Sequence, residues 1–101
     1  MAGYAYLWEF RVSPEQRAAF LHAYGPAGAW TALFRRAAGY RGTLLLADEA
    51  DATRFLTVDR WESAAAYRAF RAAFAAEYAA LDAKCAHLTQ AERALGEFAE
   101  S

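Results

Sequence analysis

Alternating apolar and polar residues predict three β-strands in the first two thirds of the chain. In residues 4–12 one face is aromatic or branched throughout, formed by Tyr4, Tyr6, Trp8, Phe10 and Val12. Residues 54–61 alternate in the same way, with Phe55, Thr57, Asp59 and Trp61 on one face. The run Leu44-Leu45-Leu46 within residues 40–47 is typical of a strand buried on both faces. The polar loop 48–53 predicts that the second and third strands pair antiparallel.

Capping residues and apolar residues at helical spacing predict two helical pieces between the first two strands. Ser13 is a favourable N-cap and Pro14 fits the first helical position, so a helix is predicted to begin there. Gly25-Pro26 ends it, because proline disfavours helical geometry at the preceding residue. A second helical piece is predicted over residues 27–38, with Gly39 in the left-handed conformation that closes a helix.

A second long helix is predicted to follow the third strand, with Ser63 as its N-cap. Its apolar stripe recurs at the helical period and extends to residue 81, through Tyr67, Phe70, Phe74, Tyr78 and Leu81. Such a stripe indicates packing against a sheet. Arg68 and Arg71 fall off the stripe and are expected in solvent.

A last strand is predicted over residues 90–98, with a bulge near Gly96. The order of elements is then βαββαβ, with the first helix in two pieces. This order predicts an α+β, ferredoxin-like domain spanning residues 1–101, an antiparallel sheet with both helices on one face.

That architecture leaves one sheet face uncovered in a chain with 57% hydrophobic and 16% aromatic residues. The uncovered face would expose more apolar surface than a monomer usually carries. Two such sheets facing each other would bury it. The sequence therefore predicts a homodimer with a barrel-like interior, a dimeric α+β barrel.

Charge, hydropathy and cysteine content bear on whether the protein binds nucleic acid or membranes and on where in the cell it is expected. The net charge is −1, with acids and bases interspersed, so no basic patch for nucleic acid is expected. No apolar stretch reaches the length of a membrane span, and no basic and apolar leader opens the sequence. With Cys85 as the single cysteine, a reducing cytoplasm is the expected location.

Several segments resemble a known family. Trp61-Glu-Ser63 followed by Ala66-Tyr67 resembles the strand-to-helix motif of the antibiotic biosynthesis monooxygenase superfamily. The segment 24–34, which contains Tyr24-Gly-Pro and Trp30, and the tail 88–98 are similar to those of bacterial members. The resemblance covers essentially the whole chain and implies the dimeric α+β barrel fold.

The resemblance also implies a pocket between sheet and helices, and chemistry that needs neither metal nor flavin. In the quinone-forming oxygenases of this group, an electron-rich polyphenol carbanion itself reacts with oxygen. Haem-degrading relatives combine an Asn, a Trp and a His, but this chain has no Asn, and Phe70 stands about where many of them carry the His. We therefore expect no haem, no metal and no other cofactor.

The candidate substrate-binding residues are mostly aromatic: Trp61, Tyr67, Trp30, Tyr24 and Trp8. Each could equally be a core residue. Arg60 could stabilise a phenolate or carboxylate, or form an interstrand ion pair. His22 could be a general base or a solvated side chain. His87 and Cys85 lack the further ligands that a metal site needs, so no metal site is predicted.

Two functions fit these observations. The first is a cofactor-independent monooxygenase that acts on a small aromatic substrate of the polyphenol or quinol type. The alternative is a non-catalytic dimeric module that binds a small apolar ligand or a partner protein. No residue spacing identifies a nucleophile or a catalytic set. A cavity beside Trp61 would favour the first, and a filled interior the second.

Overall fold

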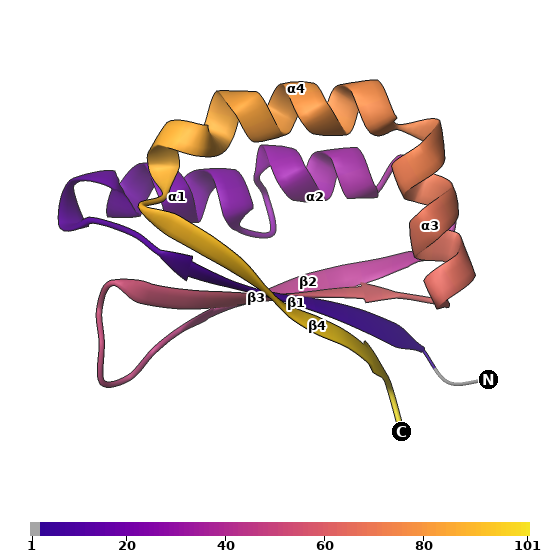
Figure 1. Ribbon diagram of the computed structural model, residues 1–101, viewed down its shortest axis with the longest axis horizontal. Helices are drawn as coiled ribbons and strands as arrows, with labels where there is room; N and C mark the ends of the chain where they lie inside the picture. Colours follow the sequence, from indigo (N-terminus) through magenta and orange to yellow (C-terminus); the bar gives the residue numbers. More distant parts are fainter. Residues whose placement is uncertain (1–2) are drawn as a thin grey trace.

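The computed structural model describes residues 3–101 and contains a four-stranded antiparallel sheet (Figure 1). The strands are β1 (Tyr4–Arg11), β2 (Tyr40–Ala47), β3 (Arg54–Trp61) and β4 (Ala91–Ala99), in the order β2-β3-β1-β4. Each neighbouring pair is antiparallel. The predicted α+β, ferredoxin-like fold is confirmed, and the last strand begins and ends one residue later than predicted.

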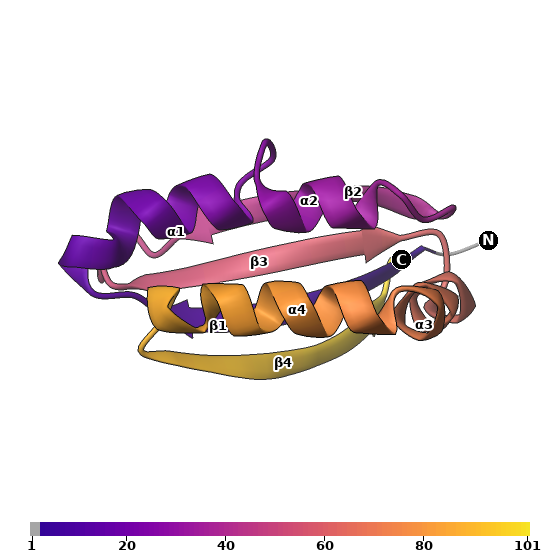
Figure 2. The ribbon, with the colours of Figure 1, turned by 90° about the horizontal axis from the view of Figure 1, so that it is seen from above.

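All the helices cover the same face of this sheet (Figure 2). The first helical segment consists of the 3-10 turn η1 (Pro14–Gln16), α1 (Arg17–Tyr24) and α2 (Ala29–Phe34). The second consists of α3 (Ala64–Ala73), α4 (Ala75–Cys85) and the 3-10 turn η2 (Ala86–Leu88). Among the described residues, no helix has both the length and the apolar character needed to cross a membrane.

Local signals in the sequence explain some of the helix ends. The Ser63 hydroxyl accepts a hydrogen bond from the Ala66 amide at 3.0 Å, as an N-cap should. Gly39 has the predicted left-handed conformation, with a φ of +89°, but it does not close a helix. The helix predicted over residues 27–38 is shorter, because α2 ends at Phe34 with Arg35 as its C-cap. Ser13 makes no side-chain cap bond among the described residues, because the first turn there is the tighter 3-10 type.

The second helical segment bends at Phe74, where one continuous helix was predicted. Phe74 has φ −112° and ψ 26°, outside the helical region, so α3 ends and α4 begins around it. The bend takes the apolar stripe to two parts of the core. Phe70 packs on Trp61 with ring centroids 5.0 Å apart, and Tyr78 packs on Trp30 at the same separation.

The core lies between the helices and the facing side of β1 and β3. Residues of β3 alternate strictly, and Phe55, Thr57, Asp59 and Trp61 are buried as the pattern predicted. Trp61, Phe20 and Phe55 are almost completely enclosed. The aromatic rings therefore pack mainly on one another in the space between the two layers.

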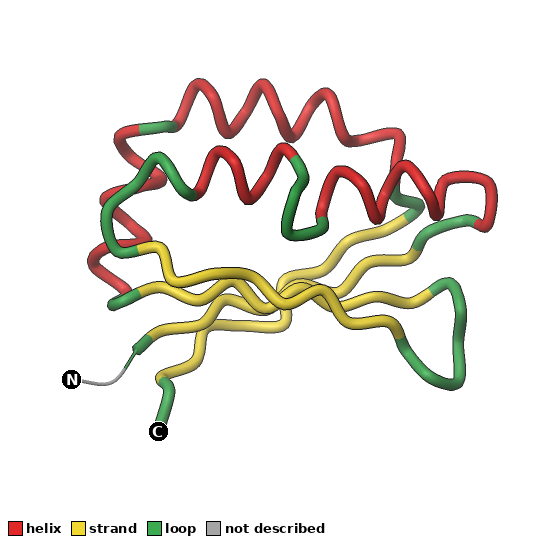
Figure 3. The backbone as a smooth tube through the Cα atoms, turned by 180° about the vertical axis from the view of Figure 1, so that it is seen from behind, coloured by secondary structure: helices red, strands yellow, loops and turns green. Residues whose placement is uncertain are grey.

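The opposite face of the sheet, here called the outer face, has no helix over it (Figure 3). Leu44 and Leu46 are 53% and 45% exposed on it, and Phe98 of β4 is 50% exposed. The prediction that the Leu44-Leu46 run is buried on both faces is therefore wrong for the single chain. The reason is that β2 is an edge strand with helices on only one side.

Bulges interrupt two strands, each next to a glycine with positive φ. In β4 the pairing with β1 shifts between Leu7 and Trp8, where Leu7 lies opposite Gly96 at φ +143°. This confirms the bulge predicted near Gly96. In β2 the pairing with β3 shifts between Tyr40 and Gly42, which has a φ of +129°.

Candidate functional site

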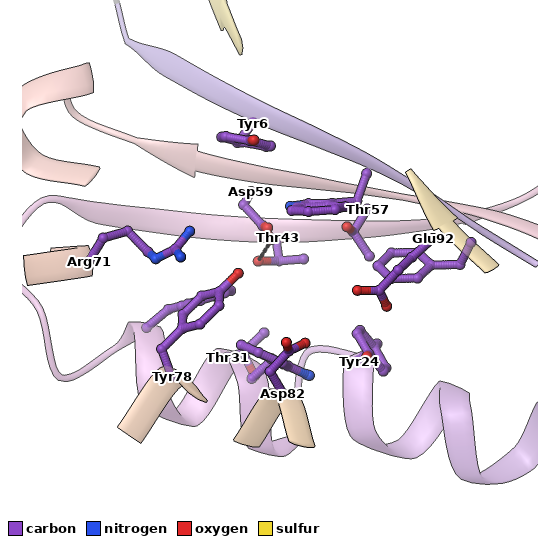
Figure 4. A pocket seen from close by; sticks show the side chains of 14 residues that line it. Tyr6, Tyr24, Thr31, Thr43, Thr57, Asp59, Arg71, Tyr78, Asp82 and Glu92 are labelled. Atoms are coloured by element: carbon purple, nitrogen blue, oxygen red, sulfur yellow. Dashed lines mark hydrogen bonds between the residues drawn. The ribbon is translucent and has the colours of Figure 1, made fainter. Parts of the chain in front are cut away.

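A cavity of about 260 Å³ lies between the sheet and the helices. Every strand and every α-helix contributes to its wall, and Figure 4 shows polar side chains pointing into it from both layers. The lining residues are Tyr6, Trp8, Phe10, Tyr24, Trp30, Thr31, Phe34, Thr43, Thr57, Asp59, Arg71, Tyr78, Asp82 and Glu92. The size and the aromatic walls suit a compound of one or two rings.

The sheet side of the cavity holds a buried carboxyl group. Asp59 is only 9% exposed, and no cation lies within ion-pair distance of it among residues 3–101. Burial raises its pKa to about 6, and a hydrogen bond from the Thr43 hydroxyl opposes that rise. Asp59 therefore changes its protonation state close to neutral pH, as a general base should.

One cation, Arg71, is among the residues that line the cavity with Asp59. The guanidinium of Arg71 in α3 points into the cavity from the side (Figure 4). It donates a hydrogen bond to the Tyr67 hydroxyl at 2.9 Å and lies 3.9 Å from the centre of the Tyr78 ring. None of the carboxylates described is within ion-pair distance of Arg71, so its charge is available to an anionic ligand.

The other end of the cavity is acidic. Glu92 of β4 lies on the far side of the cavity from Arg71, and Asp82 of α4 lines the cavity from the helical layer (Figure 4). Partial burial and the neighbouring Asp82 raise the pKa of Glu92. The cavity thus has a positive and a negative end, with Asp59 between them.

Three of the sequence-predicted site residues line this cavity. They are Trp8 of β1, Tyr24 of α1 and Trp30 of α2. Tyr24 and Trp30 are buried and contact each other, with ring centroids 5.9 Å apart. These residues come from separate elements, so the fold brings them together from distant parts of the sequence.

Two predicted aromatic residues stand behind the lining. Trp61 is fully buried and packs against Phe34, Tyr40, Tyr67 and Phe70. Tyr67 stacks on Tyr4, packs against the Tyr6 ring at a tilt of 44°, and accepts the hydrogen bond from Arg71. Tyr67 thus contacts the lining residues Tyr6 and Arg71 without lining the cavity itself.

The two remaining predicted residues lie away from the cavity. Arg60 is on the outer face, where its guanidinium donates to Glu100 at 2.6 Å, so the ion-pair alternative describes its placement. His22 is an exposed residue of α1, which agrees with the solvated alternative. The structure does not bring either side chain to the cavity.

The sequence did contain a signal for one site residue that was not predicted. Asp59 is an acidic residue on the otherwise apolar, core-facing side of β3, and such a group is costly to bury without a purpose. Arg71 was expected in solvent because it lies off the apolar stripe, and it is exposed. It also lines the cavity, which the residue spacing did not predict.

No cluster of three or more His, Cys, Asp or Glu side chains suited to a metal ion is found within residues 3–101. Cys85 is buried and forms no disulfide.

Comparison with known proteins identifies relatives of this fold. The family model described as antibiotic biosynthesis monooxygenase matches residues 4–81, which include the first three strands and most of the helices. No curated protein matches the chain.

Several solved structures share the fold at low sequence identity. A protein from Bordetella bronchiseptica, described as a putative antibiotic biosynthesis monooxygenase, has a TM-score of 0.76 at 16% identity, covering 100% of this chain and 99% of its own. A protein of the same description from Nitrosomonas europaea has a TM-score of 0.71 at 16% identity, with coverages of 96% and 88%. SnoaB from Streptomyces nogalater, a cofactor-independent oxygenase, has a TM-score of 0.63 at 19% identity, with coverages of 97% and 92%.

Proposed function

Because the chain belongs to the antibiotic biosynthesis monooxygenase family, we propose that it is a cofactor-independent monooxygenase acting on a small aromatic substrate of the polyphenol or quinol type. The observation that carries this proposal is the buried Asp59 carboxyl, which titrates near neutral pH inside an aromatic cavity. The cofactor-independent oxygenase SnoaB, which has the same fold, supports it as a relative.

The proposed reaction begins with a proton transfer to Asp59. The ionised carboxylate takes a proton from a substrate hydroxyl or an acidic ring C–H, which leaves an electron-rich anion. The anion reduces O₂ and forms a carbon hydroperoxide after protonation. Loss of water then gives the quinone: one oxygen atom stays as the new carbonyl, the other leaves as water, and the substrate loses two hydrogen atoms.

Arg71 is the proposed binding group for the substrate anion. Its guanidinium would hold a phenolate oxygen by charge-assisted hydrogen bonds, and Tyr67 and Tyr78 fix its position. Trp8, Tyr24 and Trp30 would contact the ring faces. In this arrangement the substrate lies between the cation and the base.

Arg71→Met is expected to weaken binding of acidic hydroxynaphthalenes by about 10-fold to 100-fold, because it removes a hydrogen bond to a charged group. The matched control is Arg68→Met on the same helix, since Arg68 is exposed and bonds Glu97 instead of lining the cavity. Ligand-induced shifts in Tm, titrated for both variants and the parent, measure the difference. Equal affinities for the two variants would contradict the role of Arg71.

Trp61→Phe is expected to lower the free energy of unfolding by about 1–2 kcal/mol, because the smaller ring leaves a gap in the core. If Trp61 only supports the cavity wall, affinity for hydroxynaphthalenes should change little. If it contacts the ligand, as the family resemblance implies, affinity should fall more than stability does. Thermal unfolding with and without ligand separates the two results.

A second copy of the chain is the proposed partner for the outer face. Its exposed apolar residues Leu44, Leu46 and Phe98 are flanked by ion pairs at the two ends of the sheet, Arg54 with Glu9 at 2.6 Å and Arg60 with Glu100 at 2.6 Å. An apolar centre with a polar rim is the usual anatomy of a protein interface. We therefore propose a homodimer in which the two sheets face each other.

Oxygen uptake and product analysis test the function. With a panel of dihydroxynaphthalenes in metal-free buffer, we expect saturable oxygen consumption and quinone formation above the rate of spontaneous oxidation. Binding without oxygen consumption would favour the alternative, a non-catalytic module for small apolar ligands. No ligand-induced shift in Tm with any compound of the panel would contradict the oxygenase and would favour a module that binds a partner protein.

A further inference from the structure

A chain of hydroxyl groups reaches Asp59 from the edge strand. The Thr43 hydroxyl donates to Asp59 Oδ1 at 2.8 Å, and the Tyr40 hydroxyl lies 2.6 Å from Thr43 Oγ1. The Thr43–Asp59 bond is drawn in Figure 4. A hydroxyl has one hydrogen, and Thr43 gives its hydrogen to the carboxylate. Tyr40 must therefore be the donor in its bond with Thr43.

The bulge in β2 makes this arrangement possible. Tyr40 pairs with Trp61 and Thr43 pairs with Asp59, and both β3 residues face the core. Residues three apart in a regular strand point to opposite faces. The extra residue between Tyr40 and Gly42 restores a common face, so both hydroxyls lie on the side of Asp59.

The hydroxyl chain constrains the base at the point where it acts. Because Oδ1 is held by Thr43, the other carboxylate oxygen is left to accept a proton from a ligand in the cavity. The Tyr40 donor occupies an acceptor site of Thr43, which directs the Thr43 hydrogen toward Asp59. Asp59 is nine-tenths buried, so solvent provides little competing hydrogen bonding.

We propose that Thr43 and Tyr40 are positioning residues that orient Asp59 and stabilise its ionised form. This inference rests on the proposed function for the identity of Asp59 as the base. Neither residue touches the reacting atoms in this role. They act only through the Asp59 carboxylate, so their removal is expected to change the midpoint pH of the Asp59 titration.

Other charged and titratable groups face Asp59 from the surrounding elements. They are Tyr6 from β1, Tyr24 from α1, Tyr67 and Arg71 from α3, Tyr78 and Asp82 from α4, and Glu92 from β4. Substitutions in β2 leave all of them in place. A change in the titration of Asp59 in such variants therefore reports on Thr43 and Tyr40.

The test is a titration of the Asp59 side-chain carboxyl by carbon-13 NMR in the ligand-free protein. Thr43→Val keeps the shape and removes the donor to the charged form, so the midpoint is expected to rise by about one pH unit. Tyr40→Phe should raise it by a smaller amount, because Thr43 still donates but is less well oriented. Thr43→Ser keeps a hydroxyl and should restore the parent midpoint.

Thr57→Val is the matched control. Thr57 of β3 lines the cavity as Thr43 does, but among the described residues its hydroxyl makes no hydrogen bond with Asp59. A midpoint in Thr43→Val equal to that in Thr57→Val would overturn the inference, as would a Thr43→Ser midpoint as high as that of Thr43→Val. Because this titration needs no substrate, its outcome is independent of oxygen uptake. A failure of the oxygenase assay would contradict the proposed function while leaving the positioning of Asp59 intact.

Discussion

Asp59→Asn is expected to lower oxygen-dependent turnover by about 10²-fold to 10⁴-fold, the usual contribution of a general base. An amide cannot take the substrate proton, while the size and burial of the side chain stay the same. Ligand affinity should change much less, because Arg71 and the aromatic walls remain. Oxygen uptake under saturating hydroxynaphthalene measures the loss. Turnover within a few-fold of the parent would contradict the assignment of Asp59 as the base.

The same variant is expected to be more stable than the parent above about pH 6. Burial raises the pKa of Asp59 from 3.8 to about 6, so between these values the folded chain binds more protons than the unfolded chain. The stability of the parent therefore falls as pH rises through this window. The total loss is about 3 kcal/mol, at about 1.4 kcal/mol per pKa unit.

Thermal unfolding at two pH values checks this expectation. Asp59→Asn should have a Tm higher than that of the parent by several degrees at pH ~8, and a similar Tm at pH ~3.5, where the parent carboxyl is mostly protonated in both the folded and the unfolded state. Asp82→Asn is the control, since Asp82 lines the same cavity but is exposed. A lower Tm for Asp59→Asn at the higher pH would contradict a destabilising buried charge.

The double variant Leu44→Asp and Leu46→Asp is expected to convert a dimer into a monomer. The parent should have the mass of two 11.2 kDa chains by light scattering at micromolar concentration. In a two-fold dimer each new carboxylate appears twice in an apolar interface, so we expect Kd to rise by at least about a thousandfold. The fold should survive, because Leu44 and Leu46 are exposed in the single chain.

Ala80→Asp provides the control for that experiment. Ala80 is exposed on α4, in the helical layer on the other side of the sheet, so a carboxylate there should leave the mass of the dimer unchanged. Dissociation by both substitutions would indicate a general loss of stability. A parent mass near 11.2 kDa would contradict the dimer outright.

The strands and the sheet face were predictable because each depends on a local repeat. In β3 the period of two is unbroken, so burial alternates without exception from Arg54 to Trp61. The Ser63 cap and the Gly39 conformation also follow from neighbouring residues. An uncovered sheet face was predicted from the order of the elements, but the Leu44-Leu45-Leu46 run was expected to be buried on both faces, because an apolar run does not show which side of a strand stays uncovered in the single chain.

The cavity was only partly predictable, because it depends on how the elements meet. Trp8, Tyr24 and Trp30 line it, and all three were chosen from their aromatic character alone. Arg71 precedes the bend at Phe74 and Tyr78 follows it, and the guanidinium of Arg71 lies 3.9 Å from the centre of the Tyr78 ring. The bend at Phe74 could not be predicted from the sequence, because no proline or glycine lies near it.

The bulge at Gly42 makes the count of residues in β2 as important as their identity. Deleting Arg41 would restore simple alternation, and Tyr40 and Thr43 would then become neighbours two apart in a regular strand. Inserting one more residue would turn the Tyr40 side chain to the outer face. Within a lineage, a single codon inserted in β2 would therefore be enough to remove the support that Tyr40 gives to Asp59, although every side chain involved stays unchanged. Loss of the Arg41 codon would instead keep Tyr40 and Thr43 on the core side of the sheet.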